Sequence, residues 1–272
     1  MPLVNLHTHT NYSDGTLPPG ELAKEASLRK IAFFSLTDHD NVHAWTEIEE
    51  KLKENNIRYC YGVEISTNFH DNLHILGYGV DIKNPGFLEN LRHLKQRRIN
   101  RLEKIVELLN KEGISLSMDE FEFQESHSYG RPHAADILVR KNLFRTRKEA
   151  YEKYLMSGKS CHAPSQGFGI EESIKIIKDA GGISVLAHPG SVKNMLDIPL
   201  WKEMGLDGIE AYYPTHSNSD THEFVETARR HSLVITAGSD FHGPKSSRYK
   251  DAMSGYELEK TDLKNLEKLF IC

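Results

Sequence analysis

The chain has 272 residues, enough for one large α/β domain or two small ones with a buried core. Its formal charge of -5 comes from well-mixed charged residues, which excludes a broad basic surface for non-specific nucleic-acid binding. The cysteines, Cys60, Cys161 and Cys272, form an odd set without CxxC spacing, so neither a disulfide framework nor a thiolate zinc site is expected. No signal peptide or membrane-spanning run is visible, so we expect a cytoplasmic protein without membrane contact.

Strand-like and helix-like segments alternate in both end regions of the chain. Apolar runs of strand length predict strands at 3–6, 31–36, 58–65, 73–80, 183–187, 208–212 and 233–237. Helical patterns between them predict helices at 21–30, 41–55, 171–180, 192–204, 220–231 and 261–270. Repeated β/α units of this kind predict an α/β barrel of mostly parallel strands with seven core strands.

The pattern changes in the middle of the chain. From Phe87 to Leu109 apolar residues recur at helical spacing until Gly113, and further helical segments are expected at 132–141 and 146–156. We therefore expect residues 84–161 to be an all-helical insertion between two barrel segments, 1–83 and 162–272.

Unusual polar residues stand at the C-terminal ends of the predicted strands, the face where barrel enzymes carry their chemistry. The first strand leads into two histidines spaced by two, whose side chains point the same way in an extended chain. The candidate ligands are His7, His9, Asp14, His39, Glu64, His74, His188, Asp240 and His242.

Each of these residues alone has an ordinary explanation. The His7-Thr8-His9 stretch could be a polar loop, the acids around His39 could cap a helix, and His188 before Pro189 could be a turn residue. Their coincidence on one face favours a metal centre. Imidazole and carboxylate in near balance favour Mn, with Fe or Zn as alternatives, over a thiolate-closed zinc site. Nine donors exceed the needs of one ion, so we expect two or three ions bridged by Glu64.

The stretches HTHTNYSDG, TDHD, GVEIS, AHPG and SDFHG closely resemble the motif pattern of the PHP (polymerase and histidinol phosphatase) superfamily. The resemblance covers the barrel portion and implies a distorted (β/α)7 TIM-like barrel that holds three metal ions and hydrolyses phosphate esters. It implies one ion at His7, His9, Glu64 and Asp240, a second at Asp14, His39 and His242, and a third at Glu64, His74 and His188. We assign the catalytic role to Asp14, His39, Glu64 and Asp240.

Asp14 indicates which group within the superfamily the chain resembles. Many PHP proteins, histidinol phosphatases among them, have histidine at this position, whereas the aspartate resembles a group acting on nucleoside 3′,5′-bisphosphates and short 5′-phosphorylated RNA ends. The stretches YGRPH at 129–133 and YEKYL at 151–155 are similar to the helical substrate cap of that group. The resemblance therefore implies removal of the 3′-phosphate from nucleoside bisphosphates, with 5′-3′ trimming of short RNA at the same site.

The expected chemistry needs no side-chain nucleophile. Clustered metal ions lower the pKa of a bound water toward ~7 and clamp the attacking and leaving oxygens. We therefore expect attack by a metal-bridging hydroxide without a phosphoenzyme. Asp38 and Asp40 are expected to orient His39 or a neighbouring imidazole.

A second phosphate on the substrate needs its own cationic contacts. Arg131 offers a planar fork, Pro132 at a helix start leaves backbone N–H groups for an anion, and His133 lies in the same turn. The alternative is that Gly130 and Pro132 merely begin a helix whose Arg131 is solvated. His216, after the sixth strand, is a further candidate substrate contact, with an ordinary loop histidine as its alternative.

Two other functions stay open at this point. One is a phosphatase for another small phosphomonoester such as histidinol phosphate. The other is a metal-binding module without catalysis, as PHP domains inside larger polymerases can be. The intact ligand set and the length of the chain argue against the second.

Overall fold

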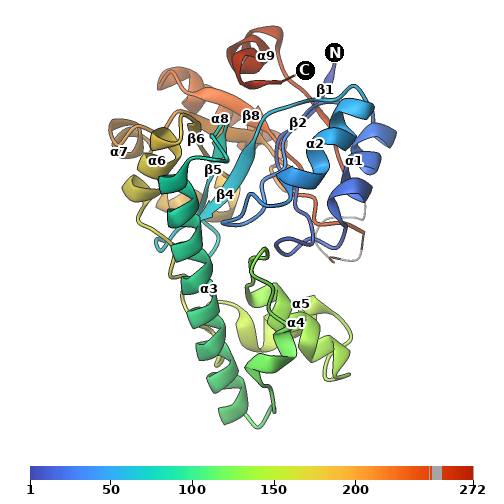
Figure 1. Cartoon of the computed structure of the whole chain (residues 1–272). Helices are drawn as coiled ribbons and strands as arrows, with labels where there is room; N and C mark the ends of the chain where they lie inside the picture. The colour runs from blue at the N-terminus through green and yellow to red at the C-terminus, as the bar shows by residue number, and fades with distance from the viewer. Residues whose placement is uncertain (245, 247–252, 272) are drawn as a thin grey trace.

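The computed structural model describes residues 1–244, 246 and 253–271, and Cys272 lies outside them. These residues form a mixed α/β fold with two sheets, ordered β3-β2-β1-β9 and β4-β5-β6-β7-β8 (Figure 1). The first sheet consists of β1 (Leu3–Asn5), β2 (Ile31–Phe34), β3 (Arg58–Tyr59) and β9 (Tyr256–Glu257). The second consists of β4 (Gly62–Ser66), β5 (His74–Tyr78), β6 (Ile183–Leu186), β7 (Gly208–Tyr212) and β8 (Val234–Ala237).

Backbone contacts join the two sheets beyond the ends of their strands. Thr8, after β1, pairs with Phe241, after β8. His39, after β2, pairs with Glu64 in β4. These bridges lie at the strand ends that carry the candidate ligands, so they bring loops from both sheets to one place. A closed seven-stranded barrel stays a prediction.

Three features of the sheets differ from the sequence expectation. The single strand expected at 58–65 is two strands, β3 and β4, in different sheets. The chain crosses β2 closely at this break, because a Cβ on Gly62 would lie 2.2 Å from Oγ of Ser35 and 2.8 Å from the carbonyl oxygen of Leu36. Strand β5 runs antiparallel to both β4 and β6. The short strand β9, antiparallel to β1, was not expected.

Most helices surround the strands, whereas α3 leads away from them to α4 and α5 (Figure 1). The helices beside the strands are α1 (Pro19–Leu28), α2 (Trp45–Glu54), α6 (Ile170–Asp179), α7 (Ile198–Glu203), α8 (Asn218–Arg230) and α9 (Lys260–Leu266). The others are α3 (Pro85–Lys111), α4 (Arg131–Arg140) and α5 (Arg147–Ala150), which continues into a π-helical turn at Tyr151–Leu155.

The prediction of a single helix at 192–204 was wrong, because the structure has two helices there. A 3-10 helix spans Pro189–Met195 and α7 begins only at Ile198. Asp197 starts α7 by accepting a hydrogen bond from the N–H of Leu200 at 3.1 Å. Pro199 then occupies the first turn, where its missing N–H costs nothing.

Two clusters of buried apolar side chains underlie this arrangement. The larger one joins the strands to the inner faces of their helices and includes Cys60, and the smaller one joins α4 to the second half of α3 and includes Cys161. Both cysteines are free thiols. Helix α3 belongs to both clusters, because Leu91 packs into the larger one and Leu102 into the smaller one. One continuous helix therefore carries the two parts.

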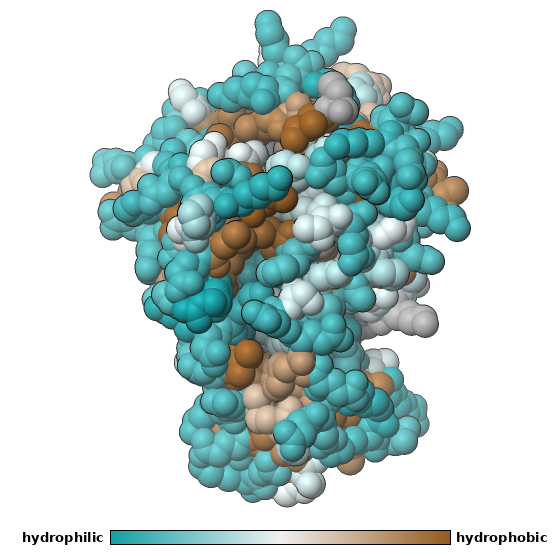
Figure 2. All heavy atoms as spheres, in the orientation of Figure 1, coloured by the Kyte–Doolittle hydropathy of each residue, from teal (hydrophilic) through white to brown (hydrophobic). Residues whose placement is uncertain are grey.

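The surface agrees with the mixed composition of the chain. Hydrophilic residues cover most of the face in Figure 2, with apolar residues showing mainly in its hollows. Among the described residues, no helix is both long and apolar enough to cross a membrane.

We predict that Leu138→Ala, in α4, will lower the free energy of unfolding. Leu138 is fully buried in the smaller cluster, and removing such a side chain costs about 2–5 kcal/mol through lost burial and a residual cavity. Urea denaturation followed by circular dichroism measures the change. Leu143→Ala is the control, because Leu143 is 49% exposed. Equal effects of the two substitutions would contradict the smaller core.

Candidate metal centre

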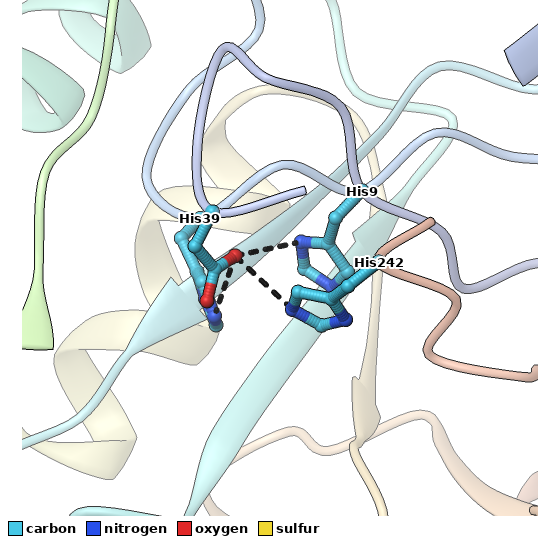
Figure 3. Close-up of side chains that lie close together, drawn as sticks. His9, His39 and His242 are labelled. Atoms are coloured by element: carbon cyan, nitrogen blue, oxygen red, sulfur yellow. Dashed lines mark ion pairs between the residues drawn. The ribbon is translucent and has the colours of Figure 1, made fainter. Parts of the chain in front are cut away.

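The structure brings all nine candidate ligands to one place. They come from the ends of β1, β2, β6 and β8, from the loop after β1, and from within β4 and β5. All are buried except His74, whose side chain is 12% exposed. Figure 3 shows the imidazoles of His9, His39 and His242 turned toward one another, with dashed ion pairs that join each of them to Asp14. Side chains far apart in the sequence therefore share one buried site.

The first group of ligand atoms is that of His7, His9, Glu64 and Asp240. Nε2 of His9 lies 3.2 Å from Oε2 of Glu64 and 3.0 Å from Oδ1 of Asp240. Nε2 of His7 lies 3.3 Å and 3.4 Å from the same two oxygens. These four residues are the set that the sequence resemblance implies for one ion.

A second group surrounds Asp14. Its Oδ1 lies 3.1 Å from Nε2 of His242, 3.8 Å from Nε2 of His39 and 3.8 Å from Nδ1 of His9. The ligand atoms of these four residues lie within 4.8 Å of one another. The group contains the three residues expected for a second ion, together with His9, which was expected at the first.

The third group is centred on the other side of Glu64. The ligand atoms of His39, Glu64 and His74 lie together, with Nδ1 of His74 2.8 Å from Oε1 of Glu64. Nε2 of His188 lies 2.9 Å from the same oxygen. Oε2 of Glu64 meanwhile faces His7, His9 and His39. Glu64 thus has the bridging place between groups that the sequence predicts for it.

The donor atoms of this cluster fit divalent cations. Among the described residues, Nε2 of His7, Nε2 of His9, Oδ1 of Asp14, Nδ1 of His39 and Oε2 of Glu64 are buried without a hydrogen-bond partner. Buried polar atoms without partners are costly, and coordination by a cation removes that cost. Imidazole nitrogen with carboxylate oxygen also matches the ligand preference of Mn, Fe and Zn. The donor set of the cluster therefore fits a site for several metal ions.

The charges around the cluster favour cations as well. Burial would raise the pKa of Glu64, but His39, His74 and His7 hold it well below its ordinary value. Burial lowers the pKa of His39 well below its usual range, against the opposing effect of Glu64 and Asp14. Burial also opposes protonation of His9, but Asp240 and Glu64 raise its pKa to about 9. At that nitrogen a metal ion competes with a proton.

Two residues that the sequence analysis did not single out as site residues support the ligands. Glu210 in β7 is fully buried; its Oε1 lies 2.9 Å from Nδ1 of His7, and its Oε2 accepts a hydrogen bond of 2.8 Å from the N–H of His188. The hydroxyl of Tyr213 donates to Oδ2 of Asp240 at 2.8 Å. A glutamate inside an apolar predicted strand was a visible signal for Glu210, because an unpaired buried carboxylate is expensive.

Within the described residues, Asp38 and Asp40 make no direct hydrogen bond to an imidazole, but Asp38 reaches His9 through Ser13, whose Oγ lies 3.5 Å from Nδ1 of His9. Oδ1 of Asp38 accepts hydrogen bonds from the N–H of Thr10 at 2.8 Å and the hydroxyl of Ser13 at 2.6 Å. Asp40 accepts from the N–H of Ser66 at 2.8 Å and from its hydroxyl at 2.7 Å. These carboxylates hold the backbone segments that carry the ligands, and so act on the imidazoles through the chain.

Arg131 and His133 lie at the start of α4, opposite the cluster. Nη1 of Arg131 donates to Oδ2 of Asp71 at 2.8 Å, and the side chain is 13% exposed, so Arg131 is not simply solvated. Arg131 lines a cavity of about 440 Å³ that Asp14 and His242 also line. Nδ1 of His133 accepts a hydrogen bond from the N–H of Gly130 at 3.1 Å. That contact caps the helix, and burial lowers the pKa of His133.

His216 uses both ring nitrogens for backbone contacts. Nδ1 lies 2.8 Å from the carbonyl oxygen of Ala211, and Nε2 accepts a hydrogen bond from the N–H of Gly190 at 3.1 Å. These contacts hold the turn that follows His188. Both ring nitrogens are therefore used by the backbone, which argues against the substrate contact expected of His216.

Comparison with known proteins agrees with this geometry. The family profile described as the PHP domain matches residues 5–167. The chain is 31% identical to the 3′,5′-nucleoside bisphosphate phosphatase of Chromobacterium violaceum, over 90% of this chain and 88% of that protein. It is 32% identical to the 5′-3′ exoribonuclease Rnm of Escherichia coli, over 89% of this chain and 86% of that protein.

A solved structure from Chromobacterium violaceum, described as an amidohydrolase with bound sulfate and no metal, has the same fold. It matches with a TM-score of 0.85 and 30% identity, over 98% of this chain and 97% of that one. With the profile match and the buried cluster, this likeness establishes that the chain belongs to the PHP family. Within the family it is a metal-dependent phosphoesterase related to the bisphosphate phosphatase and to Rnm.

We predict that Glu210→Gln will weaken metal binding by about 10- to 100-fold, the usual cost of losing a carboxylate that orients a ligating histidine. Glutamine keeps the shape of the side chain but removes the charge beside Nδ1 of His7. Calorimetric titration of chelator-stripped protein with Mn²⁺ measures the affinity. Glu203→Gln, at an exposed position of α7, is the matched control. Unchanged affinity in Glu210→Gln would refute the role of Glu210.

Proposed function

We propose that this enzyme removes the 3′-phosphate from nucleoside 3′,5′-bisphosphates and, at the same site, trims short 5′-phosphorylated RNA from its 5′ end. The observation that carries the proposal is one cavity with two kinds of anion-binding group. Its walls hold the metal-binding side chains of Asp14 and His242 and the guanidinium group of Arg131. A substrate with two phosphates can therefore contact the cluster and this arginine together. The names of the related proteins agree with such substrates.

The cluster would hold two or three divalent ions, for which we propose Mn, with Fe or Zn as alternatives. The ions would share the nine expected ligands, of which Asp14, His39, Glu64 and Asp240 would be the catalytic ones. Such ions supply a water of lowered pKa and neutralise charge on the phosphoryl oxygens. The protein keeps its donor atoms in place through Glu210 and Tyr213, which contact His7 and Asp240.

The second anion site would lie around Arg131. Among the described residues, the hydrogen bonds of Arg131 leave from Nη1 alone, so the rest of its planar fork is available to a phosphate. Asp71 accepts from Nη1 of Arg131 at 2.8 Å and from Nη2 of Arg101 at 2.7 Å. It therefore holds two guanidinium groups close together. Arg131 would thus bind the 5′-phosphate, with His133 shaping the turn beside it.

We also propose that two parts of the chain have different roles. Residues 1–83 and 162–272 would form a distorted (β/α)7 barrel that carries the metal ions. Residues 84–161 would form the substrate cap, because α4 places Arg131 and the π-helical turn places Tyr151 in the wall of the cavity beside Asp14. The cap would select substrates by their second phosphate and shield the reacting bond from bulk water.

We expect the protein loaded with Mn²⁺ to release phosphate from adenosine 3′,5′-bisphosphate far faster than from AMP or histidinol phosphate. Only the first substrate presents a 3′-phosphate beside a 5′-phosphate. A colorimetric phosphate assay at equal substrate concentrations gives the three rates, and prior treatment with a chelator should abolish all of them. Equal rates on the three substrates would reject the assigned specificity. Faster release from histidinol phosphate would favour a phosphatase for another small phosphomonoester.

We expect Arg131→Ala to raise KM for adenosine 3′,5′-bisphosphate about tenfold or more with a smaller effect on kcat, since a hydrogen bond to a charged group contributes about 1.5–3 kcal/mol. Asp71 keeps Arg101, His162 and the N–H of Ser165 as partners, so the loop remains held. Steady-state kinetics separate the two constants. Arg140→Ala, at the exposed far end of α4, is the control. A variant with wild-type KM would remove Arg131 from the anion site.

A further inference from the structure

Arg98 contacts three separate segments of the chain from the middle of α3. Its Nη1 donates to Oδ2 of Asp40 at 3.1 Å and to Oγ of Ser66 at 2.7 Å. Its Nε donates to the carbonyl oxygen of Tyr129 at 2.8 Å. The side chain is 15% exposed and the carboxylate of Asp40 is fully buried. One guanidinium group therefore ties two parts of the large core to the segment that leads into α4.

Each of these segments leads directly to a group of the proposed site. Asp40 follows His39, and Ser66 stands two residues after Glu64 on β4. Tyr129 stands two residues before Arg131, the first residue of α4. The atoms that Arg98 holds are therefore only one or two residues from two metal-binding side chains and from the proposed phosphate contact.

The local backbone is shaped around this contact. Asp40 has a φ of 51°, in the left-handed region that non-glycine residues adopt at a cost. Its side chain balances that cost by bonds to Arg98 and Ser66. On the other side, a Cβ on Gly130 would lie 2.6 Å from Nη2 of Arg98, so only glycine lets the chain approach the guanidinium group this closely. Within the described residues, Arg98 is the one cation within ion-pair distance of Asp40.

Arg98 and Arg131 differ in how their guanidinium groups are used. Both line a narrow cavity of about 50 Å³ with His39 and His74. However, Nε and Nη1 of Arg98 are directed at protein acceptors, and Nη2 lies against Gly130. Its fork is therefore used by the protein itself, which fits a role in holding other groups and not in binding a phosphate.

Neutral contacts also lie between the two parts of the chain. Nδ2 of Asn41 donates to the carbonyl oxygens of Tyr12 and Ser126, each at 2.8 Å, and the N–H of Ser128 donates to Tyr12 at 2.8 Å. They join the loop after β1 to the segment before α4. Charge-assisted bonds of an arginine are stronger and more directional than neutral ones. Arg101 and Arg131 make such bonds to Asp71, whereas Arg98 makes them to the segments that follow His39 and Glu64.

We propose that Arg98 is a positioning residue that fixes the separation between the metal-binding side chains and Arg131, so that the enzyme selects substrates by the spacing of two anionic groups. The selection of substrates rests on the proposed function, whereas the mechanical coupling through Arg98 does not. A misplacement of about 1 Å in such a site can cost about 100-fold in rate.

The first measurement tests the coupling without a substrate. Hydrogen exchange by mass spectrometry on the Mn²⁺-loaded protein should show exchange about tenfold faster or more in Arg98→Met, within both 37–41 and 128–133, because a buried carboxylate loses its cation. Arg98→Lys keeps a charge for Asp40 but lacks the fork, so faster exchange is expected at 128–133 alone. Arg92→Met, on the exposed side of α3, should change neither segment. Wild-type exchange at 128–133 in both Arg98 variants would overturn the proposal.

The second measurement tests the selection. In Arg98→Lys, which keeps a charge for Asp40, kcat/KM should fall about 100-fold for adenosine 3′,5′-bisphosphate, yet remain within about threefold of wild type for p-nitrophenyl phosphate, which has one anionic group. Metal content should stay at the wild-type level. Equal losses on both substrates would overturn a positioning role. A wild-type enzyme without preference for the bisphosphate would refute the proposed function, while the exchange result would still decide the role of Arg98. If Arg98→Met does not fold, exchange at 128–133 and the two rates in Arg98→Lys decide the role of Arg98.

Discussion

The structure depends on one buried carboxylate surrounded by imidazoles. Glu64 is 1% exposed, and a lone ionised carboxylate at such a depth would cost several kcal/mol of folding free energy. Five histidines from four strands or strand ends contact its two oxygens, so the charge is compensated only if all of these elements meet. The burial of Glu64 and the gathering of the strand ends are therefore the same requirement. Metal ions would compensate the charge of Glu64 and coordinate the surrounding imidazoles.

Strained backbone and buried carboxylates outside the ligand set hold the strand ends in this arrangement. His188 and Asp240 both have positive φ values, 30° and 51°, which turn the chain sharply as it leaves β6 and β8. Glu210 holds the N–H of His188 and the ring of His7. Asp38 holds the loop after β1. The ligands are thus oriented by residues that would not contact the ions themselves, a common feature of metal sites.

Helix α3 connects the metal centre to the part of the chain in which we propose the second anion site. Its first half packs in the core that carries the ligands, and its second half packs against α4, which carries Arg131. Arg98 lies between the two halves and reaches both sides of the cavity. A rigid helix with such a central contact can keep two anion-binding groups at a constant separation, which loops alone would not maintain.

The sequence by itself determined most helices and strands of the two end regions and the residues that gather at the strand ends, because periodicity and isolated histidines in apolar surroundings are local signals. It could not show that the chain breaks between β3 and β4, since that break depends on how closely Gly62 approaches Ser35, the residue after β2. It also could not assign His216 to a backbone contact or connect Asp40 with Arg98, 58 residues away. Tertiary structure alone decided these points, because hydrogen bonds between distant residues form only after the core has packed and leave no periodic trace in the chain.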